Sequence, residues 1–325
     1  MALFGIRFDL RNPAFAGVPD VERYAAAIDM CEWADRLGFV SCILSEHHGA
    51  DDGYLPSPLP LAAAIASRTR TIRINVAALV ASFHDPLRLA EDVAIVDLIS
   101  RGRLDIVVTN GYVASEFAMF DRPLHERPKR TTEVVQTLRQ AWSGEPFQYR
   151  GRTARITPRP AQPGGPQITL GGSTEAAARR AARLGDGFLP SSPELWEPYR
   201  DERQKAGHPD PGPYAGGDTS AFVLATDVEA TWRAVAPYFL HEVNAYGRWM
   251  AEAGVDQGGY REVGDVDALR ATGQYRVLTP DEMTAELRAG GDYAFALFHP
   301  MVGGIPPALA WESLHLFERE VLPRL

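Results

Sequence analysis

Residues 72–111 have the sequence IRINVAALVASFHDPLRLAEDVAIVDLISRGRLDIVVTNG, which contains the patterns of a strand, a helix and a second strand. Residues 72–80 and 104–109 are apolar and rich in β-branched side chains, as buried strands are. Between them, Asp85 and Pro86 match the N-cap and the first position of a helix. The buried face of that helix is marked by apolar residues at helical spacing, Leu87, Ala90, Ala94 and Leu98. Strands joined through a helix are parallel, so this segment predicts one unit of a parallel sheet.

The same alternation continues along the whole chain. We expect eight strands, each followed by a helix, at residues 4–10, 39–44, 72–80, 104–109, 168–172, 187–190, 221–225 and 293–299. Eight such units favour a closed (β/α)8 TIM barrel. The competing Rossmann fold would need a glycine fingerprint after the first strand, and none occurs there.

We therefore predict a single α/β domain over residues 1–325. Residues 147–157 have the pattern of a small hairpin insertion, and long mouth loops are expected within about residues 207–274. Two stretches of this region, residues 207–217 and 257–274, are candidates for a mobile lid because the first is rich in glycine and proline and the second is polar.

The composition argues against several classes of function. The chain has 325 residues, with 33 basic and 42 acidic side chains and a formal charge of −9. This charge disfavours binding to nucleic acid or to an anionic membrane. No apolar run reaches about 18 residues, the first residues do not resemble a signal peptide, and two cysteines are too few for a disulfide framework. We expect a cytoplasmic protein with no membrane or nucleic-acid partner.

The strongest local pattern for chemistry is Glu46-His47-His48, which follows the second strand. In a barrel, the active site lies at the carboxyl ends of the strands. Adjacent side chains of an extended chain point to opposite faces, so one histidine is expected to face the barrel mouth. A histidine there could act as a base near neutral pH. The alternative is that both histidines only form hydrogen bonds to neighbouring loops.

A second candidate is the turn formed by Gly171, Gly172, Ser173 and Thr174, which joins the fifth strand to an alanine-rich helix. Two glycines allow a ligand to approach the backbone closely, and the free N–H groups at the start of a helix suit a phosphate. The alternative is an ordinary turn with a helix cap.

Other residues near the mouth have simpler explanations. Asn110-Gly111-Tyr112 could hold a planar ligand or only turn the chain. We expect Asp85 to be a helix cap, His84 to be exposed to solvent and Trp249 to pack within a helix.

Several common chemistries lack their motifs in this chain, including the metalloprotease, Walker A, nucleophile-elbow and C-x-x-C patterns. A metal-dependent barrel hydrolase that uses His47 or His48 with His84 and His299 is a further alternative. Adjacent histidines face one ion less readily than a His-x-His pair does, so we expect no metal.

Six segments of the chain, taken together, resemble the luciferase-like monooxygenase family, the flavin-dependent group that includes the bacterial luciferase subunits. They occur in the family's order and span essentially the whole chain. The segments are FGIRFDLRNP, EWADRLGFVSCILSEHHGADDGYLPSPL, ASRTRTIRINVAALV, DPLRLAEDVAIVDLISRGRLDIVVTNGY, ITLGGSTEAAARRAARLGDGFLP and SLHLFEREVLPRL. The resemblance implies a (β/α)8 barrel that binds a reduced flavin, FMN or the deazaflavin F420, at the carboxyl ends of its strands.

The resemblance also assigns roles to single positions. His47 matches the family histidine beside the isoalloxazine, and Ala77 and Ala78 match the place of a non-proline cis peptide bond under the flavin ring. The turn from Gly171 to Thr174 matches the segment whose N–H groups hold the flavin phosphate. Asn110 stands where luciferase has a phosphate-binding arginine, which implies either weak FMN binding or compensation by another basic residue.

The resemblance implies a monooxygenase that uses reduced FMN and O₂ to oxygenate a small organic substrate, with His47 assisting proton transfer. A separate flavin reductase would supply the reduced flavin. The alternatives are an F420-dependent hydride-transfer oxidoreductase, with which Asn110 is compatible, and a catalytically silent flavin-binding relative. Tyr54 and Tyr112 near the mouth favour an organic substrate with apolar area. Family members are commonly dimers, so we expect a homodimer.

Overall fold

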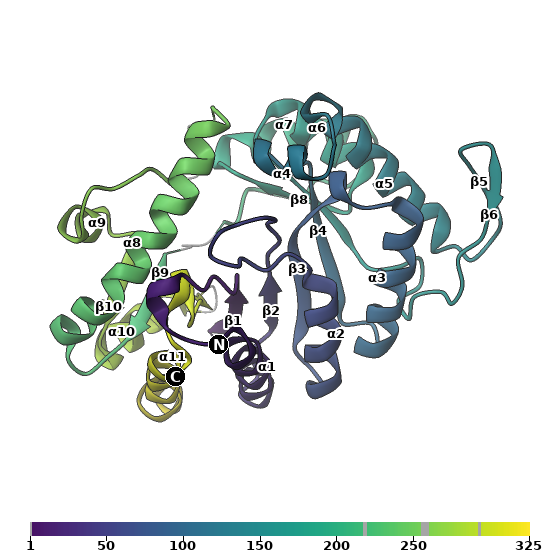
Figure 1. Cartoon of the computed structure of the whole chain (residues 1–325). Coiled ribbons are helices and arrows are strands. Elements are labelled where there is room, and N and C mark those ends of the chain that lie inside the picture. The colour runs from purple at the N-terminus through teal and green to yellow at the C-terminus, as the bar shows by residue number, and fades with distance from the viewer. Residues whose placement is uncertain (1, 217–219, 255–259, 292–293) are drawn as a thin grey trace.

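The centre of the molecule is a curled sheet of seven parallel strands with helices on its outer face (Figure 1). The structure is a computed structural model, and it describes residues 2–216, 220–254, 260–291 and 294–325. In spatial order the strands are β11 (Phe295–Phe298), β1 (Leu3–Phe8), β2 (Ser41–Leu44), β3 (Arg73–Val80), β4 (Leu104–Thr109), β7 (Ile168–Gly172) and β8 (Gly187–Pro190). Every neighbouring pair is parallel, so the carboxyl ends of the strands share one edge of the sheet.

The helices follow the strands in the expected alternation. They are α1 (Asp20–Arg36), α2 (Pro58–Arg68), α3 (Pro86–Ser100), α4 (Ala114–Met119), α5 (Arg127–Ala141), α6 (Glu175–Leu184), α7 (Trp196–Lys205), α8 (Val228–Glu252), α9 (Val266–Thr272), α10 (Pro280–Gly290) and α11 (Pro307–Leu316). Asp85 caps α3 as predicted, because its carboxylate accepts the N–H groups of Leu87 and Arg88. Among the helices described, none is both long and apolar enough to cross a membrane.

An aromatic core joins the first and last strands to the helices behind them. Phe317, just after α11, contacts Phe4 of β1 at 5.1 Å and Phe298 of β11 at 4.8 Å between ring centroids. Because side chains alternate across a strand, residues an odd number of positions from these aromatics point to the concave side of the sheet. Arg7, three positions after Phe4, and His299, directly after Phe298, are two such residues and line a cavity there.

A separate parallel pair of strands, β9 (Ala221–Leu224) and β10 (Tyr275–Leu278), lies beside β11. Phe222 of β9 contacts Phe298 of β11 at 5.0 Å between ring centroids. All eight predicted strands are present, but β9 pairs with β10, which the sequence did not predict. The segment of β10 has only four residues, and Arg276 interrupts its apolar pattern.

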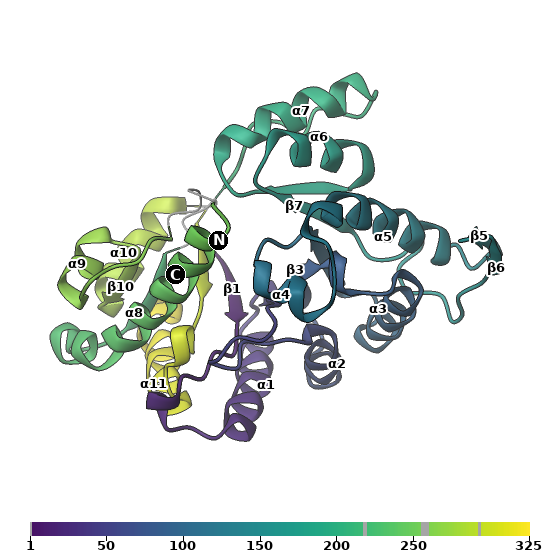
Figure 2. The same cartoon turned by 45° about the horizontal axis from the view of Figure 1, so that its top comes forward.

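The predicted hairpin is present outside the main sheet (Figure 2), where β5 (Phe147–Tyr149) and β6 (Arg152–Ala154) pair antiparallel. Arg150 and Gly151 form its turn with positive φ angles of 48° and 76°.

The two stretches predicted as lids differ from each other. Residues 207–216 contain no helix or strand, whereas part of the stretch 257–274 forms α9. The expectation of a loop was wrong for α9, because Asp265 accepts two backbone N–H groups and starts a helix. Residue 217 and residues 257–259 of these stretches lie outside the described residues.

Candidate active site

The two histidines that follow β2 point in different directions. Nδ1 of His47 lies 2.8 Å from Oε1 of Glu116, in the first turn of α4, and the His47 ring lies 4.4 Å from the ring of Trp249. His48 turns the other way, and its Nε2 lies 2.7 Å from Oε1 of Glu46. The divergence is what adjacent positions of an extended chain produce.

Glu116 is the partner of His47 that the sequence did not reveal. Its carboxylate is buried, with 1% of the residue exposed, and Oε1 accepts both the Nδ1–H of His47 and the backbone N–H of His48. A carboxylate that accepts a hydrogen bond from Nδ1–H fixes the tautomer of the imidazole and leaves Nε2 as its basic nitrogen. Glu116 lies 69 positions after His47, and no local pattern marks it. Only its place soon after the end of β4 could have suggested a role.

His48 and His84 hold the backbone of the site through a shared carboxylate. Glu46 Oε1 accepts from Nε2 of both histidines, at 2.7 Å and 3.1 Å, and Oε2 accepts the N–H of Val80 at 2.8 Å. Burial alone would raise the pKa of Glu46, but the hydrogen bonds from His48 and His84 hold that pKa below its ordinary value. The expectation that His84 is simply solvent-exposed was wrong, because Glu46 reaches from the end of β2 to the end of β3.

The peptide bond between Ala77 and Ala78 is cis, and both residues are half-buried. Ser45 donates a hydrogen bond of 2.9 Å to the carbonyl of Ala77. The register between β3 and β4 shifts between Ala77 and Leu79. The backbone of β3 is therefore irregular at the end that carries the site. Ser45, which contacts this part of β3, is two positions before His47 in the chain.

Four aromatic side chains enclose His47. The ring centroids lie at 4.4 Å (Trp249), 4.8 Å (Tyr54), 5.8 Å (Tyr112) and 6.0 Å (Tyr246) from that of His47. Burial raises the pKa of Tyr54 to about 12, so its hydroxyl stays protonated near neutral pH. Trp249, expected only to pack within a helix, instead faces the site because α8 extends over it. The enclosure leaves only 11% of the His47 side chain exposed.

The turn between β7 and α6 has a packing reason for its glycines. A Cβ on Gly171 would lie 2.5 Å from Cγ2 of Thr109, and a Cβ on Gly172 would lie 2.5 Å from Cβ of Ala177. Thr174 caps α6 by accepting the N–H of Ala177. These contacts explain the sequence of the turn without a ligand, although the backbone from Gly171 to Ser173 is half-exposed and accessible to one.

A basic side chain stands beside Asn110 at this turn. Nη1 of Arg180, on α6, lies 3.3 Å from Oδ1 of Asn110. Burial and the nearby charge of Arg183 lower the pKa of Arg180. Among the described residues no carboxylate forms an ion pair with Arg180, whereas Arg183 is paired with Glu202. A half-buried guanidinium that has no carboxylate partner among the described residues fits a phosphate group. The sequence offered only the general expectation that some basic residue compensates for Asn110.

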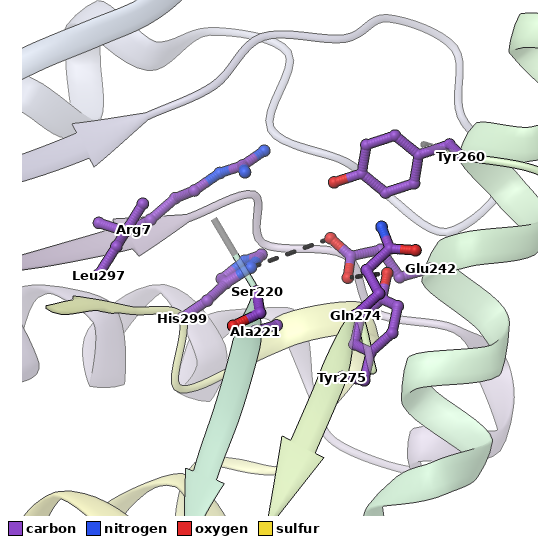
Figure 3. Close-up of a pocket in the computed structure, with 9 residues that line it drawn as sticks. All are labelled: Arg7, Ser220, Ala221, Glu242, Tyr260, Gln274, Tyr275, Leu297 and His299. Carbon is purple, nitrogen blue, oxygen red and sulfur yellow. Dashed lines mark hydrogen bonds and ion pairs between the residues drawn. The ribbon is translucent and has the colours of Figure 1, made fainter. Parts of the chain in front are cut away.

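A second polar cluster is buried between β1, β11 and α8. Oδ2 of Asp9 lies 3.5 Å from Nε2 of His299. Oε1 of Glu242 lies 3.9 Å from Nδ1 of the same ring (Figure 3). Burial opposes the charge of Asp9, but His299 and Arg11 hold the pKa of Asp9 well below its ordinary value. Asp9 is therefore ionised.

This cluster bears on the metal hypothesis. Asp9, Glu242 and His299 are a group of possible metal ligands found within the described residues, with ligand atoms inside 4.8 Å of one another. His47 bonds Glu116, whereas His48 and His84 meet at Glu46. Two histidines of the set proposed for a hydrolase are therefore close together, but His299 contacts Asp9 and Glu242 instead.

The curled parallel sheet, with its polar residues at the carboxyl ends of the strands, is an α/β fold of the kind the resemblance implies. Residues 3–290 match the family model described as luciferase-like monooxygenase. The chain therefore belongs to the luciferase-like monooxygenase family, as the sequence predicted.

Known proteins show the same relationship. Monooxygenase RslO1 from Streptomyces bottropensis has a similar structure with a TM-score of 0.75 and 27% identity, covering 99% of each chain. The FMNH₂-dependent dimethylsulfone monooxygenase of Pseudomonas putida is 26% identical over 245 residues, 69% of this chain and 66% of that protein. The F420-dependent glucose-6-phosphate dehydrogenase of Amycolatopsis mediterranei is 30% identical over 193 residues, 55% of this chain and 57% of that protein. Three further curated relatives are matched over 47%, 49% and 36% of their length, so the chain spans about half of them or less.

Proposed function

We propose that this protein is a flavin-dependent monooxygenase that uses reduced FMN and O₂ to oxygenate a small organic substrate. The observation that carries the proposal is the enclosed His47–Glu116 pair at the carboxyl edge of the sheet, in a chain of this family. The FMNH₂-dependent relative supports the choice of cofactor. The flavin, when bound, would supply the oxygen chemistry.

The chain offers groups for both ends of the flavin. The Arg180 guanidinium and the N–H groups of the turn Gly171, Gly172, Ser173 and Thr174 would hold the phosphate, with Asn110 orienting Arg180. The backbone at Ala77 and Ala78 would lie against the flavin ring, as the resemblance implies. Arg180 would then bind the phosphate in place of the arginine that luciferase has at the position of Asn110.

His47 would move the proton in this reaction. Glu116 accepts the Nδ1–H, so Nε2 is the atom that can take a proton from the reacting group and return it. The rings of Tyr54, Tyr246 and Trp249 lie around the His47 ring and would exclude water from the reaction site.

An F420-dependent hydride-transfer oxidoreductase is the second candidate. It is favoured by Asn110, which replaces the phosphate-binding arginine, and by the F420-dependent relative of Amycolatopsis mediterranei. The net charge of −9 disfavours a cofactor with an acidic tail.

We also propose that β9 completes a closed (β/α)8 barrel with the seven strands of the main sheet, in a single domain over residues 1–325. The contact between Phe222 of β9 and Phe298 of β11 supports this closure. The hairpin at residues 147–157 and the mouth segments within residues 207–274 would be additions to that barrel. The setting would be the cytoplasm, with a separate flavin reductase as the supplier of reduced flavin.

A homodimer is proposed from one exposed face of α3. Ile95, Leu98 and Ile99 lie at helical spacing and are 44%, 39% and 42% exposed. The expectation that Leu98 belongs to the buried face of α3 was wrong, because Leu89, Val93 and Val96 form that face. Sedimentation velocity should give a dimer for the unchanged chain and a monomer for Leu98→Glu. A monomeric unchanged chain would contradict this part of the proposal.

Anaerobic titration with reduced FMN and, in parallel, with reduced F420 tests the main proposal. We expect saturable binding of FMN and weaker binding of F420. Tighter F420 binding would favour the second candidate, and no saturable binding at millimolar concentrations of either would contradict both. Substrate-independent flavin binding with no oxygen or hydride chemistry across candidate substrates would indicate a silent relative.

A further inference from the structure

Arg7 is a half-buried cation that the site described above does not use. Its side chain lines a small cavity between β1, β11 and the start of the β9–β10 pair (Figure 3). Its Nη2 donates a long hydrogen bond of 3.4 Å to the Tyr246 hydroxyl, and its Nε is buried without a hydrogen-bond partner. Within the described parts of the chain, no carboxylate oxygen lies within the 4.0 Å of an ion pair with Arg7.

The neighbouring carboxylates already have guanidinium, imidazole or hydroxyl partners. These contacts join Asp9 to Arg11 and His299, Asp52 to Arg11 and His241, and Glu242 to Tyr275 and His299. Among the described residues, Arg7 therefore has no carboxylate in direct contact, although the Glu242 carboxylate lines the same cavity. A guanidinium whose Nε is buried and unpaired has donors left for an acidic group.

The walls of the cavity add a hydroxyl donor. Figure 3 shows the Tyr260 hydroxyl and the Arg7 guanidinium facing the same gap, with Glu242 on its other side. Burial raises the pKa of Tyr260, which keeps this hydroxyl protonated and able to donate. Glu242 would repel a second acidic group on the ligand. The cavity therefore suits a ligand that has a single acidic group.

Tyr246 contacts both Arg7 and the surroundings of His47. Its hydroxyl accepts the Arg7 hydrogen bond and shares a second hydrogen bond of 2.9 Å with the Tyr54 hydroxyl, while its ring lies 6.0 Å from the His47 ring. A molecule held by one end at Arg7 could therefore present its other end towards His47.

We propose that Arg7 binds the acidic group of an organic monoacid, a carboxylate or a sulfonate, which is the substrate of the enzyme. The guanidinium fork matches such groups in two parallel hydrogen bonds. The assignment of this ligand as substrate rests on the proposed function, whereas the binding of the acid by Arg7 does not depend on a flavin.

Calorimetric titration of the flavin-free protein with matched acids and amides tests the proposal. The pairs are benzoate and benzamide, phenylacetate and phenylacetamide, and benzenesulfonate and benzenesulfonamide. We expect at least one acid to bind about ten- to a hundredfold more tightly than its amide. Arg7→Gln should abolish this preference, and Arg7→Lys should keep part of it because the charge remains. Arg73→Gln is the matched control, since Arg73 is paired with Asp105 outside the cavity, and it should keep the whole preference.

Equal binding of acids and amides, no saturable binding of any acid, or an acid preference that survives in Arg7→Gln would each overturn the proposal. The preference of the unchanged protein is measured without any variant, so a misfolded Arg7→Gln does not remove the test. Reduced FMN is titrated separately, so a failure of flavin binding counts against the proposed function and leaves the acid-binding result standing.

Discussion

Replacing Arg180 by glutamine should weaken FMN binding without weakening the fold. Arg180 has no carboxylate partner in the described structure, and burial with the neighbouring Arg183 already lowers its pKa. A charge-assisted hydrogen bond contributes about 1.5–3 kcal/mol and a neutral one about 1 kcal/mol. Loss of the charge should therefore cost about 0.5–2 kcal/mol of binding, which is about two- to thirtyfold in Kd. Removal of an unpaired, half-buried charge should leave the melting temperature of the free protein unchanged or raise it.

The assay is anaerobic titration with reduced FMN and with reduced riboflavin, which lacks the phosphate. The unchanged protein should prefer FMN, and Arg180→Gln should lose most of that preference while its riboflavin affinity stays the same. Arg183→Gln is the control, because Arg183 lies on the same helix and is already paired with Glu202. The reasoning is refuted if Arg180→Gln keeps the full preference for FMN, or if it loses affinity for both flavins equally.

Three further results are expected. His47→Ala should lower turnover, measured as product formed per enzyme, by more than it weakens flavin binding, and the opposite order would indicate a binding role only. Trp249→Ala should bind reduced FMN more tightly, because the indole that covers His47 no longer has to move aside; weaker binding would indicate that the indole is part of the flavin site. Asp9 has a lowered pKa owing to His299 and Arg11 despite burial, so its stabilising effect is present above the ordinary aspartate pKa near 4 and is lost as the pH falls below that value. Urea unfolding at pH 7 and at pH 3 should therefore show a smaller loss of stability on acidification for Asp9→Asn than for the unchanged protein, and equal losses would contradict this reasoning.

Local patterns in the sequence were sufficient for most of the fold. The apolar runs of β3 and β4 and the Asp85-Pro86 start of α3 are each determined by residues close together in the chain, and the structure confirms them. The start of α10 was not predicted, although Thr279 and Glu282 form a capping box whose residues are close together in the chain. The short strand β10 was not predictable, since four residues interrupted by Arg276 give too little periodicity.

The partners within the candidate site could not be predicted in the same way. The hydrogen bond between His47 and Glu116 spans 69 positions, and the contact between Asn110 and Arg180 spans 70. Both depend on how parallel strands bring their carboxyl ends together, which no local pattern encodes. The role of Trp249 depends on the length of α8 and on the direction in which it crosses the site. The sequence identified the family and predicted a role for His47, and three-dimensional packing was needed to find the residues around His47.

The central claim is that a reduced flavin binds at the carboxyl edge of the sheet with His47 beside it. A crystal structure of the protein grown anaerobically with reduced FMN tests this claim most directly. The account predicts the phosphate in hydrogen-bond contact with Arg180 and the turn from Gly171 to Thr174, and the flavin ring between His47 and the backbone of Ala77 and Ala78. A flavin bound elsewhere, or a phosphate that does not contact Arg180, would contradict it.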